Sequence, residues 1–93
     1  MTIANQIIVT VSGVDKVGIV AEVTTVMAKY DVNIEDIKQT LMQGHFVMFM
    51  LCNIANSQYS FKDIKEALTS TGQKLGMEIW VQKKEIVDNM HKI

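Results

Sequence analysis

Four stretches of the chain are rich in β-branched, aromatic and other apolar residues, with a two-residue periodicity that is typical of β-strands. They cover residues 6–12, 34–42, 46–54 and 77–82. The middle two flank the short Gly-containing segment Gln43-Gly44-His45, so we expect them to form a hairpin. Either Gln43-Gly44 or Gly44-His45 can supply the two-residue turn, and both choices leave the same side chains on each face.

Three other stretches repeat their apolar residues at three- and four-residue spacing, which indicates amphipathic helices. The first covers residues 17–30, with Asp15 as its expected N-cap. The second begins after Ser60, which resembles a capping box with Asp63, and ends at Gly72 or Gly76. The third is short and covers residues 85–93, where the stripe consists of Ile86, Val87, Met90 and Ile93.

The order strand, helix, strand, strand, helix, strand predicts a ferredoxin-like α+β fold, because crossover connections are right-handed. We expect a four-stranded antiparallel sheet in the order 4-1-3-2, with both main helices on one face. This domain is predicted to cover residues 1–84, followed by an amphipathic tail over residues 85–93. Hydrophobic residues make up 48% of the 93-residue chain, which is enough for one packed core.

The pattern also predicts a second apolar surface, on the face of the sheet that the helices leave open. Ile37 and Leu41 should face the helices together with Phe46, Met48, Met50 and Cys52. The open face then carries what we call the apolar patch, which consists of Ile8, Val47, Phe49, Leu51 and Trp80. Soluble monomers rarely expose a patch of this size. It should be covered by the C-terminal tail, by a second subunit in a homodimer, or by both.

Charge and composition exclude several kinds of partner. Nine cationic residues, all Lys, stand against ten acidic ones, so the net charge is −1 and the chain has no basic surface for nucleic acid or anionic membrane. The longest apolar run, residues 46–52, is far shorter than the roughly 20 residues that span a bilayer. Because the N-terminus resembles no secretory signal and the single Cys52 cannot form an internal disulfide, we expect a cytoplasmic protein.

The segment Gly13-Val14-Asp15-Lys16-Val17-Gly18 is the strongest candidate for a ligand site. It places two glycines before a helix, where free backbone N–H groups and the helix dipole favour a carboxylate. The same spacing also suits an ordinary turn in which the glycines relieve strain.

The stretch VTVSGVDKVGIVAEVTTVMAKYDVNIEDI resembles the ACT domain, in which a D-x-P-G-I/L turn follows the first strand and x-N-I opens the second. The ending DNMHKI is similar to the M-H-R-I ending of small stand-alone bacterial and archaeal members, and the ACT modules of glycine-cleavage regulators are also similar. The resemblance implies a regulatory module that binds an amino acid between subunits and signals to an unidentified enzyme or regulator. The implied ligand residues are Asp15, Gly18, Ile19, Asn33 and Ile34, with Gly13, Lys16 and Val17 completing the turn.

These residues fall into two groups that one small ligand cannot bridge within a single subunit. A helix of roughly 14 residues is about 20 Å long and separates the turn from Asn33. Antiparallel pairing of the edges formed by this helix and the following strand would bring each turn beside the partner's Asn33. We therefore expect a shared ligand.

No residue pattern predicts catalysis, a cofactor or a metal site. Cys52 is expected to be a buried apolar residue, and neither His45 nor His91 has metal-ligand spacing. Acylphosphatases of this topology need an Arg that the chain lacks, and RNA-recognition modules need a basic aromatic surface. Two alternatives to the amino-acid module remain: a ligand-free interaction module and a small dimeric α/β-barrel enzyme.

Overall fold

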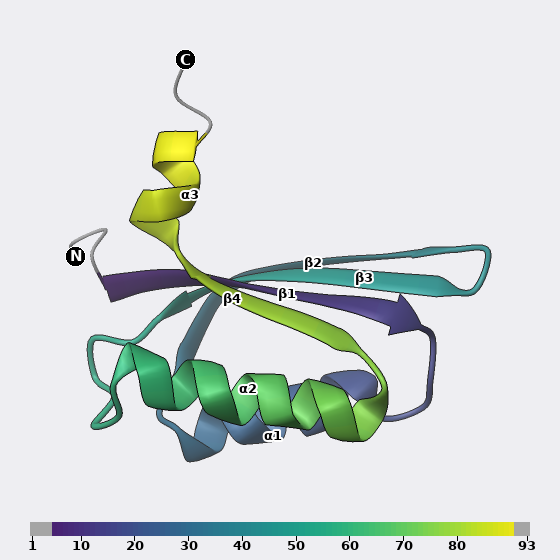
Figure 1. Cartoon of the computed structure of the whole chain (residues 1–93), viewed down its shortest axis with the longest axis horizontal. Helices are drawn as coiled ribbons and strands as arrows, with labels where there is room; N and C mark the ends of the chain where they lie inside the picture. The colour runs from purple at the N-terminus through teal and green to yellow at the C-terminus, as the bar shows by residue number, and fades with distance from the viewer. Residues whose placement is uncertain (1–4, 91–93) are drawn as a thin grey trace.

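Four antiparallel strands and three helices make up residues 5–90, the part of the chain that the computed structural model describes (Figure 1). The sheet order is β2-β3-β1-β4, which is the expected order 4-1-3-2 read from the other edge. The prediction of a ferredoxin-like fold is therefore confirmed. The elements are β1 (Gln6–Val14), α1 (Ile19–Lys29), β2 (Asn33–Met42), β3 (His45–Asn53), α2 (Phe61–Leu75), β4 (Glu78–Lys83) and α3 (Lys84–Met90).

The β2-β3 hairpin turns at Gln43 and Gly44, which decides between the two alternatives. Met42 pairs with His45, and both turn residues have positive φ, 51° for Gln43 and 81° for Gly44. Positive φ at both central positions is the mark of a type I′ turn, whose twist matches that of the flanking strands. The same register puts Phe49 and Val47 on the open face, as expected.

Helix α1 begins later than its periodicity predicts, and Asp15 is not its N-cap. Gly18 holds that position with φ 89° and ψ 1°, and no side chain caps the helix. The backbone N–H of Asp15 instead donates to the carbonyl of Gly44, with an N–O distance of 3.0 Å. The chain therefore follows the hairpin for one more residue and needs the left-handed Gly18 to turn into the helix.

Helix α2 has side-chain and backbone caps at its two ends. The Ser60 hydroxyl accepts a hydrogen bond from the backbone N–H of Asp63 at 3.1 Å, as the sequence predicts. At the other end Gly76 is left-handed, with φ 70°, and Met77 N donates to Gly72 O at 2.8 Å. These are features of a Schellman motif, so Gly76 ends the helix.

The core lies between the sheet and the two helices α1 and α2, which cover the same face (Figure 1). Its centre consists of side chains exposed by 2% or less, among them Val9, Val11, Ile19, Val23, Met27, Met48, Met50, Cys52, Ile64 and Leu68. Ile37 and Leu41 lie on this face as predicted, but they are 43% and 59% exposed. Because β2 is an edge strand, the helices leave its side chains largely uncovered.

Helix α3 leaves β4 on the side of the sheet opposite α1 and α2 (Figure 1). Its main contacts are with β1 and β4, and residues 91–93 of the expected tail lie outside the described part. Phe49 and Trp80 are 51% and 57% exposed, so α3 does not cover the centre of the apolar patch. Within residues 5–90, no helix has the length and apolar character to cross a membrane.

Candidate functional site

The turn between β1 and α1 presents unprotected backbone to solvent. Val17 and Gly18 are exposed, and nothing lies within 4 Å of the position that a Cβ on Gly18 would take. Because no side chain caps α1, the N–H groups of its first turn have no side-chain acceptor. This backbone can therefore receive a small anionic group.

Three of the expected ligand residues in this region make contacts that position the turn within the fold. A Cβ on Gly13 would lie 2.6 Å from the sulfur of Met77, so Gly13 allows a close approach between β1 and the segment after α2. Ile19 is 2% exposed and belongs to the core. The Lys16 ammonium donates to the carbonyl of Leu75 at 2.7 Å, which holds the turn against the C-terminal end of α2.

A shallow groove beside the turn runs between the N-terminal half of α1 and the end of α2. It is lined by Val17, Gly18, Ala21, Glu22, Thr25 and Leu75. Its charged side chain is the Glu22 carboxylate, which lies in the first turn of α1. A carboxylate ligand therefore has to bind the backbone N–H groups near Gly18, away from Glu22.

The second group of expected residues opens β2. Asn33 is exposed and pairs with Asn53 of β3, whereas Ile34 is half-buried on the helix side. A bulge between Ile34 and Asp36 shifts the register by one residue, so Glu35 is left without a directly opposite partner in β3.

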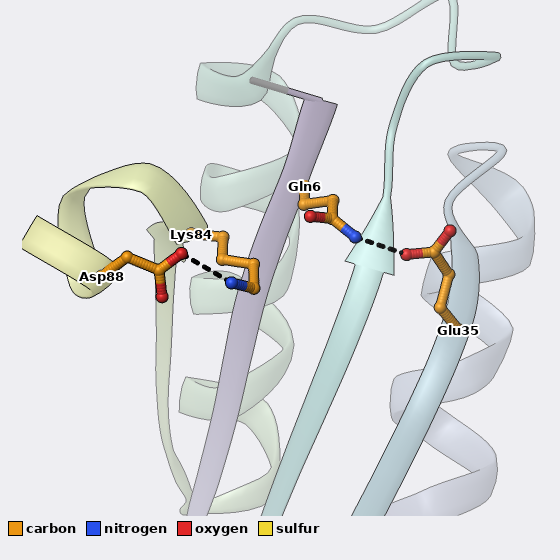
Figure 2. Close-up of polar contacts among 4 residues, drawn as sticks. All are labelled: Gln6, Glu35, Lys84 and Asp88. Atoms are coloured by element: carbon orange, nitrogen blue, oxygen red, sulfur yellow. Dashed lines mark hydrogen bonds and ion pairs between the residues drawn. The ribbon is translucent and has the colours of Figure 1, made fainter. Parts of the chain in front are cut away.

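Glu35 is a residue of this region that the sequence analysis missed. Its carboxylate accepts a hydrogen bond from Gln6 Nε2 at 2.9 Å (Figure 2). Asn53 Nδ2 donates to its other oxygen at 3.4 Å. These contacts link three strands at one end of the open face. The only sequence signal was the three-residue spacing of Ile34 and Ile37, which breaks the strand alternation and is typical of a bulge.

The structure keeps the two groups apart. Helix α1 has 11 residues, shorter than expected, and spans about 16 Å at 1.5 Å per residue. The turn lies at one end of α1 and the start of β2 at the other (Figure 1). No small amino acid can reach both within one subunit.

The expected interface residues do come together. On the open face, cross-strand pairs place Phe49, Thr10 and Trp80 in one row, and Leu51 and Ile8 in the next. Thr10 is only 8% exposed, because it lies between the two aromatic side chains. Val47 pairs with Ser12, whose hydroxyl lies 2.9 Å from Nε2 of His45.

The thiol and the possible metal ligands of the described chain do not form a reactive site. Burial, and to a smaller extent the charge of Glu35, raises the pKa of the Cys52 thiol to about 12, so it is protonated and inert near neutral pH. Among residues 5–90, no three His, Cys, Asp or Glu side chains gather closely enough to hold a metal ion.

Comparison with known proteins agrees with this geometry. The family model of the ACT domain matches residues 5–82. The chain belongs to the ACT domain family. The UPF0237 protein of Methanosarcina acetivorans is 44% identical over 90 residues, which are 97% of this chain and 98% of that protein.

Solved structures place the ACT domain in the same fold. An ACT domain protein from Streptococcus pneumoniae matches with a TM-score of 0.77 and 33% identity, covering 88% of this chain and 92% of that one. A protein assigned as a glycine cleavage system transcriptional repressor matches with a TM-score of 0.74 and 22% identity, covering 83% and 44%. At that identity the second match shows the shared fold alone. ACT domain proteins are regulatory ligand-binding modules, and this chain shares their architecture.

Proposed function

We propose that this ACT domain is a regulatory module that binds a small amino acid, acts as a homodimer and catalyses no reaction itself. The observation that carries the proposal is the uncapped start of α1, where the left-handed Gly18 leaves backbone N–H groups open to a carboxylate. The buried, protonated Cys52 thiol and the lack of a metal-binding cluster within residues 5–90 favour a binding function over the enzyme alternative.

The ligand in this proposal is shared between subunits. Its carboxylate binds near Gly18, and its amino group or side chain binds the partner's Asn33. The outer edge of β2 is unpaired in the sheet, so the α1-β2 edges of two subunits are free to run antiparallel. A ligand at this contact strengthens it, which gives the module a way to signal ligand concentration through assembly.

The apolar patch supports the homodimer, because an interface would remove Phe49 and Trp80 from water. Analytical ultracentrifugation at tens of micromolar should show a dimer. Phe49→Lys should dissociate it, since the new charge would be buried without a partner. Leu41→Lys is the control, because Leu41 is exposed on the other face of the sheet. A monomeric wild-type chain would refute the homodimer.

A ligand-free interaction module remains the second candidate, and one observation favours it. Glu22 places a negative charge in the groove beside the turn. Thermal shift against the twenty amino acids separates the two functions, because a ligand present at 100 times its Kd stabilises the native state by about 2.7 kcal/mol. A shift with one amino acid supports the regulatory module. An intact dimer with no shift at millimolar ligand supports the interaction module.

A further inference from the structure

The two edge strands carry opposite charges on the open face, one on each side of the apolar patch. Lys38 of β2 pairs with Phe49 and so extends the cross-strand row of Phe49, Thr10 and Trp80. Trp80 of β4 is at the far end of this row. Glu78, an exposed acidic residue of β4, lies one row further along beside Ser12. A cation on the β2 side therefore faces an anion on the β4 side across the width of the sheet.

Charged and apolar residues also lie at the end of the sheet where β1 begins. Helix α3 starts there with Lys84, whose ammonium lies 2.6 Å from a carboxylate oxygen of Asp88. On the far side of the same end, β2 carries Glu35 and the exposed Asp36 (Figure 2). Figure 1 shows α3 projecting to the open side of the sheet, so it can reach a molecule stacked on that face.

We propose that two copies of this chain stack open face on open face about a two-fold axis parallel to the strands, so that β2 of each lies over β4 of the other. This contact through the apolar patch deepens the homodimer of the proposed function and rests on it. It is separate from the α1-β2 edge contact that would share the ligand, because it leaves each Gly18 turn at the opposite end of the sheet from the partner's Asn33. The two sheets lie about 10 Å apart and cross at roughly 30°, as in aligned sheet packing.

This arrangement matches the charges of the two edge strands and the shape of the patch. Lys38 lies beside Trp80 and Glu78 of the partner, where the ring face and the carboxylate both attract a cation. Phe49 lies over the partner's Thr10. Its large side chain therefore fits into the depression that the small Thr10 side chain leaves between Phe49 and Trp80 of the partner.

The same axis places α3 over the acidic start of the partner's β2. Ile86, which is 52% exposed in the single chain, then gains a surface to pack against. A two-fold axis that lies in the plane of the interface but perpendicular to the strands would bring like charges together at the centre of the interface. It stacks β2 on β2, so that Lys38 meets the partner's Lys38 and like charges are desolvated together.

Cross-linking between introduced cysteines tests the axis without any ligand. The native Cys52 is completely buried and protonated near neutral pH, so it does not react. Thr40 and Glu78 are exposed, and in the proposed dimer they face each other across the interface. Thr40→Cys and Glu78→Cys chains, mixed and re-equilibrated, should be joined by a bismaleimide that spans the sheet spacing of about 10 Å.

Lys38→Cys alone is the matched variant for the other axis. In the proposed dimer its two copies lie on opposite edges and should not be joined. Joining of Lys38→Cys to itself, or no joining of the mixed chains in a sample that sediments as a dimer, would overturn the axis and leave the homodimer intact. A monomeric wild-type chain would overturn both.

Charge reversal supplies an independent readout. Lys38→Glu and Glu78→Lys should each raise the dimer dissociation constant about tenfold or more, and the double variant should return it close to the wild-type value. Effects that simply add in the double variant would contradict contact between these two positions.

Discussion

At the scale of single residues, Gly18 carries the strongest backbone constraint near the candidate site. Its φ of 89° lies in the left-handed region, which costs other L-residues about 1–2 kcal/mol. Gly18→Ala should lower the free energy of unfolding by about this amount in urea titrations, and Gly18→Asn should lower it less, because Asn adopts this conformation more readily.

The control for Gly18 is its neighbour Val17, whose side chain is fully exposed. Val17→Ala should change the free energy of unfolding by no more than about 0.5 kcal/mol. A Gly18→Ala protein as stable as the wild type would mean that the turn does not need a left-handed residue. Both glycines of the turn were recognisable from the sequence, but the cap was expected at Asp15, because composition alone does not show which residue leaves the strand last.

Cys52 gives the chain a pH dependence in the alkaline range. Its pKa is raised from 9.0 to about 12 in the folded protein by burial and, second, by the charge of Glu35. Between these values the folded state keeps a proton that the unfolded state has lost. The contribution of Cys52 to stability is therefore complete below pH 9 and declines as the pH rises toward 12.

Urea unfolding of wild type and Cys52→Ala at several pH values measures this decline. The informative quantity is the difference in stability between the two proteins at each pH. Cys52→Ala should be less stable at neutral pH, because it leaves a cavity, and the difference should shrink above pH 9. A difference that stays constant with pH would show that the thiol titrates alike in both states.

At the scale of elements, α2 and β4 depend on a close contact at Gly72. A Cβ at this position would lie 2.8 Å from the carbonyl oxygen of Met77 and 2.9 Å from Cγ1 of Ile79. Overpacking costs about 1–3 kcal/mol, whereas Ala gains about 1 kcal/mol over Gly in helix propensity. We expect Gly72→Ala to lower the free energy of unfolding by up to about 2 kcal/mol.

Ser70→Ala is the matched control in the same helix, since Ser70 is exposed and Ala favours helix there. Chemical unfolding of both variants should show a loss for Gly72→Ala and no loss for Ser70→Ala. A gain at Gly72 would mean that β4 moves away from α2 at little cost. The sequence offered Gly72 and Gly76 as alternative helix ends, and only the fold shows that one packs and the other caps.

The helices and strands themselves were largely predictable, and the errors in their expected bounds have local causes. Strand and helix periodicities identified all seven elements within residues 5–90. The start of α1 was placed early because Val17 is apolar, although it is fully exposed. The bulge at Glu35 and its bonds to Gln6 and Asn53 were missed, because strand alternation does not reveal contacts between polar residues far apart in the sequence.

At the scale of the whole molecule, the sheet separates two kinds of surface. One face is buried under α1 and α2, and the other presents the apolar patch between a β2 cation and a β4 anion. The patch followed from alternation alone, since cross-strand partners share a face whatever the exact turn. The charge pattern across the patch could not be predicted in this way, because this pattern depends on which strands form the edges and on the position of α3 relative to β2.

The last prediction concerns the shared ligand, which requires two chains because the turn and Asn33 are about 16 Å apart along α1. Asn33→Ala should weaken binding of the amino acid found by thermal shift by about 1–2 kcal/mol, since it removes one or two hydrogen bonds. Gly18→Asn should block the carboxylate position while keeping the left-handed turn. Both single-variant homodimers should therefore bind weakly.

A heterodimer of these two variants tests the sharing directly. It is made in the Phe49→Lys background, so that the subunits pair through their α1-β2 edges and not through the apolar patch, and it is isolated by different affinity tags. Two-fold pairing puts both substitutions in one site and leaves the other site with a wild-type turn and a wild-type Asn33. Isothermal titration should then recover about half of the wild-type capacity at wild-type affinity. If each subunit held a complete site, every site would carry one substitution, and wild-type affinity would not return.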